Sequence, residues 1–115
     1  MKTILIVEDD KTLNKNISFA LKNEGYNVLS AFNAEEAYEK YVEADMIILD
    51  VMLPDESGIT ICRRIREKNV VPVIFLTSCD EEQDVILGLD SGGDDYITKP
   101  FRLSILLSRI KALFR

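Results

Sequence analysis

Five short apolar runs recur along the chain, and each is followed by a segment whose apolar residues repeat at helical spacing. Runs of β-branched residues and leucine are typical of strands that are buried on both faces of a sheet. Strands and helices that alternate in this way predict parallel strands joined by crossovers, and therefore a three-layer α/β sandwich. The expected strands are Thr3–Val7, Tyr26–Ala31, Met46–Asp50, Val73–Thr77 and Tyr96–Thr98.

Five helices are expected, one after each run. Gly25 follows the apolar stripe of the first helix, as glycines often do at helix ends. Asn33 and Glu36 have the spacing of a capping box at the start of the second helix. The stripes cover residues 13–21, 34–41, 59–65, 85–89 and 103–114.

The composition allows one domain and excludes several functions. The chain has 115 residues, which is enough for one hydrophobic core and predicts a single domain over residues 1–115. Its 14 Lys and Arg against 20 Asp and Glu give a formal charge of -6, which argues against direct binding of this domain to nucleic acid or an anionic membrane. Histidine is absent, so any phosphohistidine must belong to another molecule.

Cysteine usage and the N-terminus predict a cytoplasmic protein. Cys62 and Cys79 do not form a Cys-x-x-Cys motif, and the chain lacks the cysteine density of a small secreted protein. The apolar run Ile4–Val7 is too short for a signal peptide or a membrane span. We therefore expect a reducing compartment and no membrane partner.

Ionisable and hydroxyl side chains lie at the ends of four expected strands. Because the carboxyl ends of parallel strands share one edge of the sheet, we expect these side chains to form a single site. Each motif alone has an ordinary explanation as a turn or a helix cap, and Asp10 is expected to be such a cap. Their combination, in this order along the chain, is what indicates a site. The side chains are those of Glu8, Asp9, Asp10, Asp50, Thr77, Ser78 and Lys99.

Facing carboxylates at this edge need a cation, because two of them repel by about 4 kcal/mol at roughly 4 Å in a partly buried site. A few carboxylates in a site open to solvent suit Mg²⁺, which keeps several waters and often shares a phosphate oxygen. A carboxylate beside the ion could attack a phosphoryl group and become an aspartyl phosphate. Lys99, Thr77 and Ser78 would then supply a cation and hydrogen-bond donors for the phosphoryl oxygens.

Four motifs in the chain resemble the receiver domain of bacterial two-component response regulators, and the match spans essentially the whole sequence. They are Ile4–Asp10, Ile48–Asp55, Phe75–Ser78 and Gly93–Phe101. The resemblance implies a flavodoxin-like or CheY-like fold, whose five-stranded parallel sheet has the order 2-1-3-4-5. It also implies a signalling protein that takes part in its own phosphorylation and dephosphorylation, rather than an enzyme with a separate substrate.

The resemblance implies that Asp50 is the phosphoacceptor. It would take a phosphoryl group from the phosphohistidine of a sensor histidine kinase, or from a small donor such as acetyl phosphate. Glu8 and Asp9 resemble the acid pair that holds Mg²⁺, with Asp9 as a direct ligand and Glu8 acting through water. The backbone carbonyl of Met52 would complete the protein ligands.

The resemblance also implies a switch. Lys99 would pair with the phosphoryl oxygens, and its bond to Pro100 is expected to be cis. Thr77 and Tyr96 resemble the family's switch pair, in which the hydroxyl moves to a phosphoryl oxygen and the aromatic ring turns inward. The face formed by the fourth helix, the fifth strand and the fifth helix would change shape as a result.

The segments Glu8–Asp10, Asp94–Phe101 and Arg109–Arg115 look most like the OmpR/PhoB subfamily. Its members dimerise through the same face when phosphorylated, and they carry a C-terminal DNA-binding domain. Because the chain stops where the fifth helix would pass into a linker, we expect a longer parent protein that regulates transcription.

Six residues are expected at the dimer face. The charged pairs across it would be Asp94 with Arg109 and Asp90 with Lys111. Val85 and Ile105 stand where the subfamily has a basic and an acidic partner. The contact would therefore be more apolar here, or the face would serve another partner.

Three alternatives use a similar fold. A stand-alone receiver that acts by docking to another protein would have the same motifs. A haloacid-dehalogenase-type phosphatase also uses Mg²⁺ and an aspartyl phosphate, but it needs Asp-x-Asp where this chain has Asp50-Val51-Met52. A flavodoxin-like FMN binder needs a hydroxyl- and glycine-rich loop after the first strand, where Glu8–Asp10 would repel the phosphate.

Overall fold

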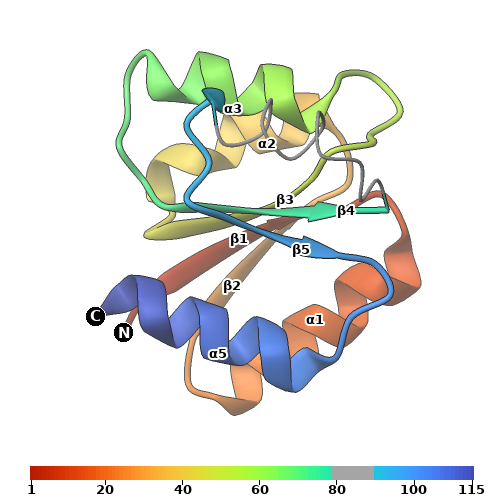
Figure 1. Cartoon of the computed structure of the whole chain (residues 1–115), viewed down its shortest axis with the longest axis vertical. Coiled ribbons are helices and arrows are strands. Elements are labelled where there is room, and N and C mark those ends of the chain that lie inside the picture. Colours follow the sequence, from red (N-terminus) through yellow and green to blue (C-terminus); the bar gives the residue numbers. More distant parts are fainter. Residues whose placement is uncertain (79–89) are drawn as a thin grey trace.

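A five-stranded parallel sheet in the order β2-β1-β3-β4-β5 forms the centre of the fold (Figure 1). The computed structural model describes residues 1–78 and 90–115. The strands are β1 (Thr3–Val7), β2 (Asn27–Ala31), β3 (Met46–Asp50), β4 (Val73–Thr77) and β5 (Asp95–Thr98). The helices are α1 (Lys11–Asn23), α2 (Ala34–Lys40), a 3₁₀ turn (Tyr41–Glu43), α3 (Gly58–Arg66) and α5 (Leu103–Phe114).

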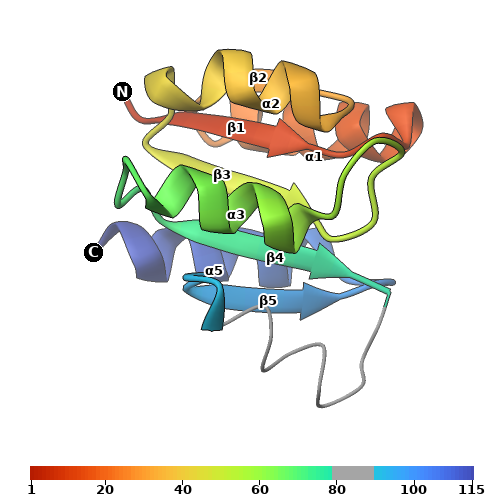
Figure 2. The ribbon, with the colours of Figure 1, turned by 90° about the horizontal axis from the view of Figure 1, so that it is seen from above.

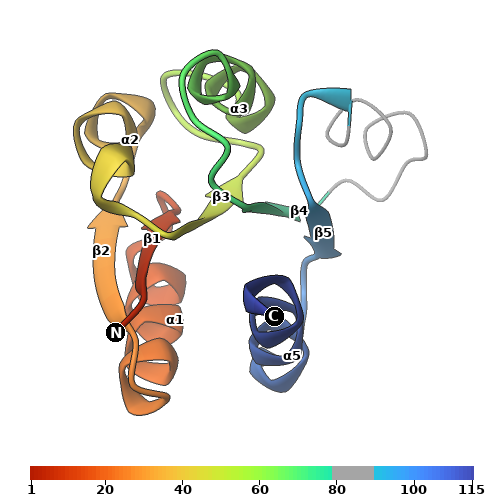
Figure 3. The same ribbon diagram turned by 90° about the vertical axis from the view of Figure 1, so that its left-hand side faces the viewer.

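Helices cover both faces of the sheet, with α1 and α5 on one side and α2 and α3 on the other (Figure 3). Side chains alternate along the strands, so that Ile4 and Ile6 join the core beneath α1 and α5. Leu5 and Val7 join the core beneath α2 and α3. Every residue of β3 and β4 is buried. The predicted three-layer α/β sandwich and its strand order are therefore confirmed.

The helices α1, α3 and α5 lie where they were predicted, and α2 differs near its end. Tyr41 was expected in the second helix but begins the 3₁₀ turn, because the chain tightens after Lys40 as helices commonly do at their C-terminal ends. The helix expected over residues 85–89 lies outside the described residues, and so does Cys79.

Two strands begin one residue away from the predicted positions, β2 at Asn27 and β5 at Asp95. Such one-residue differences are usual at the ends of elements. Within residues 1–78 and 90–115, no helix combines the length and the apolar character that a bilayer span requires.

The predicted pair of Asn33 and Glu36 caps α2, but the reciprocal bond comes from Phe32, one residue before the N-cap. The side chain of Asn33 accepts a hydrogen bond from the Glu36 N–H at 2.8 Å, and the Glu36 carboxylate accepts one from the Phe32 N–H at 2.9 Å. These bonds satisfy N–H groups that have no partner inside the helix. They fix the start of α2 beside the end of β2.

Two acids tie the loop after β3 to α2. The carboxylate of Asp55 accepts hydrogen bonds from the N–H groups of Ala34, at 2.9 Å, and Glu35, at 3.3 Å. The Tyr38 hydroxyl donates to Glu56 at 2.8 Å. The pKa of Asp55 lies below its ordinary value of 3.8, mainly because its carboxylate accepts the hydrogen bond from the Ala34 N–H. Helix α2 therefore anchors the loop that follows Asp50.

Replacing Asp55 by alanine should lower the free energy of unfolding at neutral pH, because N–H groups at the start of α2 lose their acceptor. Since folding lowers the pKa of this carboxyl, its stabilisation is present above the ordinary pKa of 3.8 and is lost as the pH falls through the folded value. Urea denaturation from about pH 7 to about pH 3 should give unfolding free energies that converge in acid. A gap that stayed constant or widened in acid would contradict this role.

Candidate functional site

The carboxyl ends of β1, β3, β4 and β5 meet at one edge of the sheet (Figure 2). The register places Thr77 of β4 beside Thr98 of β5. The Lys99 N–H donates to the Thr77 carbonyl at 2.7 Å, which extends this pairing past the end of β5. The peptide bond between Lys99 and Pro100 is cis, as predicted.

Lys99 bridges two buried carboxylates at this edge. Its ammonium donates to Glu8, which follows β1, and to Asp50 at the end of β3, the latter at 3.1 Å. Glu8 is 1% exposed and Asp50 is 4% exposed. Burial alone would lower the pKa of Lys99, but the hydrogen bonds to Glu8 and Asp50 outweigh it and raise the pKa. The lysine is therefore held as a cation between the two acids.

A third carboxylate completes the cluster. Glu8, Asp9 and Asp50 each offer one oxygen, and these oxygens lie within 4.8 Å of one another. Asp9 is the exposed member, and its pKa is raised, first by partial desolvation and then by the neighbouring Glu8 carboxylate. Three carboxylates against the single positive charge of Lys99 leave an excess of two negative charges. Oxygen donors with this excess fit a divalent cation such as Mg²⁺.

The other predicted members lie around this cluster. The backbone N–H of Met52 donates to Asp50 at 3.2 Å, while the Met52 side chain is exposed. Thr77 is buried at the end of β4, and Ser78 beside it is exposed. Asp10 caps α1, as expected, by accepting a hydrogen bond from the Leu13 N–H at 3.1 Å.

Gly58 is a site residue that the sequence did not reveal. It begins α3, and its N–H donates to the Val51 carbonyl at 2.8 Å. A Cβ atom at this position would lie 2.1 Å from the Asp50 carbonyl oxygen and 3.0 Å from the Val51 Cα. Only glycine therefore allows α3 to start this close to the end of β3. The available signal in the sequence was a glycine directly before the apolar stripe over residues 59–65.

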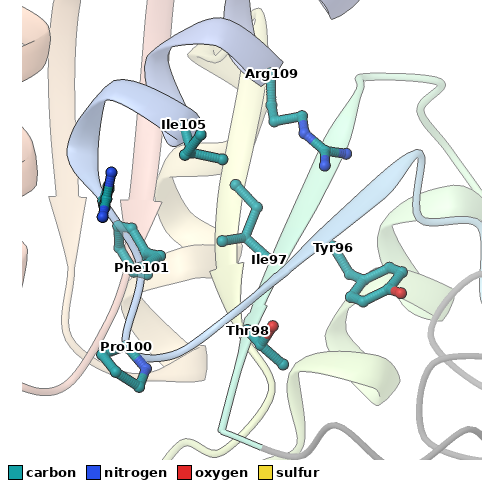
Figure 4. A pocket seen from close by; sticks show the side chains of 8 residues that line it. Tyr96, Ile97, Thr98, Pro100, Phe101, Ile105 and Arg109 are labelled. Atoms are coloured by element: carbon teal, nitrogen blue, oxygen red, sulfur yellow. The ribbon is translucent and has the colours of Figure 1, made fainter.

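Tyr96 lies at a surface hollow of about 510 Å³ between β5 and α5 (Figure 4). Ile97 points toward α5, whereas Tyr96 points to the other side of β5. The Tyr96 side chain is exposed, and Ile105 and Arg109 of α5 line the same hollow. The predicted inward turn of Tyr96 stays a prediction.

Asp94 and Arg109, expected to pair across a dimer, each have a different partner within the chain. Arg109 pairs with Asp95 at 2.9 Å. Asp94 pairs with Arg66 at 3.0 Å and also accepts a hydrogen bond from the Val73 N–H at 2.8 Å. The sequence alone does not show which of the adjacent acids, Asp94 or Asp95, faces Arg109. In the structure, Asp95 lies on the side of α5 and Asp94 on the side of α3.

The remaining residues of the predicted dimer face include one more ion pair. Lys111 lies 3.5 Å from Glu24. Asp90 and Ile105 are exposed, and Val85 lies outside the described residues. These contacts lie within one chain and do not test pairing across a dimer. The pairs of Asp94 with Arg109 and of Asp90 with Lys111 therefore stay predictions.

Comparison with known proteins identifies close relatives. The family model described as "Response regulator receiver domain" matches residues 4–111. Regulatory protein VanR of Enterococcus faecium is 49% identical over 114 residues, which cover 97% of this chain and 49% of the relative. The chain therefore spans about half the length of this curated relative.

Solved structures share the fold over the whole chain. A two-component response regulator from Clostridium difficile has a TM-score of 0.97 and 36% identity, with 100% of this chain and 97% of the other covered. The BeF3-activated DrrB receiver domain has a TM-score of 0.93 and 39% identity, with 100% and 99% covered. DrrB of Thermotoga maritima, described as an OmpR/PhoB homologue, has a TM-score of 0.93 and 39% identity, with 99% and 52% covered.

Replacing Gly58 by alanine should displace the end of β3 and lower the free energy of unfolding by about 1–3 kcal/mol, because the new Cβ meets backbone atoms that cannot rotate away. Gly25 is the matched control: its φ is +93°, yet no atom lies within 4 Å of the position of a Cβ there. Gly25→Ala should therefore cost stability through backbone strain and leave the NMR shifts of Asp50 and Val51 unchanged. Unchanged shifts at these two residues in Gly58→Ala would contradict the close contact.

Proposed function

The chain belongs to the response regulator receiver family, and from this we propose that it is a phosphorylation-activated signalling switch with Asp50 as its phosphoacceptor. The proposal rests on the hydrogen bonds and neighbouring acids of the Asp50 carboxylate. One oxygen accepts from the Met52 N–H and the other from Lys99, and the acids Glu8 and Asp9 lie alongside. A carboxylate held in this way at the mouth of a cation site is suited to nucleophilic attack on a phosphoryl group.

Glu8, Asp9, Asp50 and the backbone carbonyl of Met52 are the groups that we propose hold Mg²⁺. The excess of carboxylates over Lys99 and the spacing of their oxygens support this assignment. When bound, the ion would offset the charge of the acids and of the phosphoryl oxygens. Asp9, as the exposed acid, is the one that an ion from solvent reaches first.

Asp50 forms the new bond in the proposed transfer. One of its oxygens attacks phosphorus, and the bond from phosphorus to the nitrogen of a kinase phosphohistidine, or to the acyl oxygen of acetyl phosphate, breaks. The imidazole or acetate leaves with the bonding electron pair. Lys99, already in contact with Asp50, would bind a phosphoryl oxygen, and the Thr77 hydroxyl would bind another. Each chain takes one phosphoryl group and turns over no separate substrate.

Thr77 and Tyr96 would carry the change to the face formed by β5, α5 and the predicted helix over residues 85–89. In the proposal, the Thr77 hydroxyl moves to the phosphoryl group and the exposed ring of Tyr96 turns inward. The altered face would then favour a homodimer. Its proposed residues are Val85, Asp90, Asp94, Ile105, Arg109 and Lys111.

We propose that the parent protein is a cytoplasmic transcription regulator. The chain spans about half of the VanR relative and of the DrrB chain described as an OmpR/PhoB homologue, which supports a second domain beyond the receiver. DNA binding would belong to that domain, because the receiver carries a formal charge of -6. The sequence of the parent beyond Arg115 would distinguish this from a stand-alone receiver.

Incubation with Mg²⁺ and acetyl phosphate should add one phosphoryl group to the chain, and Asp50→Asn should abolish the gain, because an amide is a far weaker nucleophile than a carboxylate. Intact-protein mass spectrometry measures the addition. Glu39→Gln, which makes the same chemical change at an exposed position on α2, is the matched control and should be phosphorylated normally. Undiminished labelling of Asp50→Asn would remove Asp50 from the role of acceptor.

Lys99→Ala should still accept some phosphoryl group, but phosphorylation should no longer change the environment of Tyr96 or promote dimerisation. The reason is that the phosphoryl oxygens lose the cation that couples them to the end of β5. Tyr96 NMR shifts and sedimentation velocity measure the two effects. Lys68→Ala, an exposed lysine near the end of α3, is the control. A Lys99→Ala protein that dimerised normally on phosphorylation would exclude Lys99 from the switch.

A further inference from the structure

Asn14 is a polar residue buried in the face of α1 that packs on the sheet. It is 1% exposed, and its side chain uses both of its polar atoms. The amide nitrogen donates to the Glu8 carbonyl at 3.0 Å and to the Ala31 carbonyl at 3.3 Å. The amide oxygen accepts from the Ser30 hydroxyl at 2.8 Å and from the Ser18 hydroxyl at 3.5 Å. The amide is therefore fully hydrogen-bonded, as a buried amide must be.

These partners fix the orientation of the amide. Backbone carbonyls only accept hydrogen bonds, so the nitrogen of Asn14 must face Glu8 and Ala31. Hydroxyl groups can donate, so the oxygen faces Ser18 and Ser30. A reversed amide would set its oxygen against two carbonyl oxygens and lose both donated bonds. The side chain therefore has one favourable orientation.

The contact with Glu8 is made at the peptide bond that joins two of the three clustered acids. The Glu8 carbonyl belongs to the peptide that links Glu8 to Asp9. The Glu8 N–H donates to the Ala31 carbonyl at 3.0 Å, so Glu8 and Asn14 share this acceptor at the end of β2. The backbone of Glu8, directly after β1, is thus held by β2 through its N–H and by α1 through its carbonyl.

We propose that Asn14 is a positioning residue for the Glu8–Asp9 pair: by holding the peptide between them, it keeps both carboxylates facing Asp50 and so sets the affinity of the cluster for a divalent cation. The inference rests on the proposed function, since it concerns the same acidic site. Asn14 itself does not reach the carboxylate oxygens, and it acts through the backbone. Replacing Asn14 by an uncharged residue leaves the charge of the site unchanged. A change in cation affinity would therefore report a change in the positions of the carboxylates.

The test uses Mn²⁺ as the probe, because its free form is measured directly by electron paramagnetic resonance. Asn14→Leu keeps a side chain of similar size but removes both donated hydrogen bonds. Its affinity for Mn²⁺ should fall by about tenfold, as is usual when a group that orients metal ligands is lost. In the metal-free protein, the backbone NMR shifts of Asp9 and Asp10 should also move. Thermal denaturation of each variant reports stability separately.

Ser18→Ala is the matched control. Ser18 belongs to the same buried network, in which its hydroxyl contacts the Asn14 oxygen at 3.5 Å and the Ser30 hydroxyl at 3.3 Å, so the bonds from Asn14 to Glu8 and Ala31 survive its loss. This variant should lose stability while its Mn²⁺ affinity stays within about twofold of the unmodified chain. A folded Asn14→Leu protein that binds Mn²⁺ as tightly as Ser18→Ala would overturn the inference. That result would not affect the proposed role of Asp50 as the phosphoacceptor.

A second variant decides the matter if Asn14→Leu does not fold. Asn14→Ala removes the same two donated hydrogen bonds without placing a branched side chain against the carbonyls, and it should weaken Mn²⁺ binding by about tenfold. Unchanged affinity in this variant would overturn the inference. Failure of the unmodified chain to bind Mn²⁺ and to accept a phosphoryl group on Asp50 would instead overturn the proposed function, and the inference with it.

Discussion

The ion pairs that Lys99 makes with Glu8 and Asp50 are the interaction on which the site depends. Taking a carboxylate out of water costs several kcal/mol, and removing one partner of such a buried pair destabilises a protein by about 3–5 kcal/mol. The two acids lie at the ends of neighbouring strands, β1 and β3, and Lys99 reaches them from beyond the end of β5. The pairing therefore forms only when β1, β3, β4 and β5 are assembled in this order. A lone lysine cannot neutralise three acids, which leaves the site suited to a divalent cation and to a phosphoryl group that offers Lys99 a new partner.

Groups outside the cluster determine where its carboxylates point. Gly58 lets α3 begin against the Asp50 carbonyl, and Asp55 and Glu56 fasten the intervening loop to α2. Asn14 performs the corresponding task for the peptide between the other two acids. All of these contacts are made to backbone groups or to loops next to the acids. These contacts thus restrict the chain that carries the acids and do not occupy the carboxylate oxygens of Glu8, Asp9 and Asp50.

The sheet and the acidic cluster could be predicted because they depend on local patterns. Buried runs of apolar residues mark β1, β3 and β4, and parallel topology then brings the strand ends together. Asn14 was missed because the apolar stripe of the first helix was traced through Leu13 and Ile17. The buried face of α1 contains Asn14, Ile17, Ser18 and Leu21, so a polar pair stands inside the stripe. A polar residue at such a position was the available signal.

The partners of charged side chains were less predictable than the site itself. Asp94 and Asp95 are adjacent in sequence, but successive side chains leave an extended chain in opposite directions. Asp94 consequently reaches Arg66 of α3, and Asp95 reaches Arg109 of α5 on the other face. Sequence spacing cannot rank such alternatives, because the choice depends on the direction of each side chain at the edge of the sheet. The close approach of Gly58 to the Asp50 carbonyl could not be predicted for a similar reason, since it is a distance between α3 and the end of β3.

The central claim is that Asp50 becomes an acyl phosphate, and chemical trapping tests it most directly. Borohydride reduces an acyl phosphate on aspartate to the alcohol of homoserine and releases phosphate. After treatment of the unmodified chain with Mg²⁺ and acetyl phosphate, then borohydride, peptide mass spectrometry should find homoserine in place of aspartate at position 50. Homoserine at another aspartate, or none in a chain that had gained a phosphoryl group, would contradict the account.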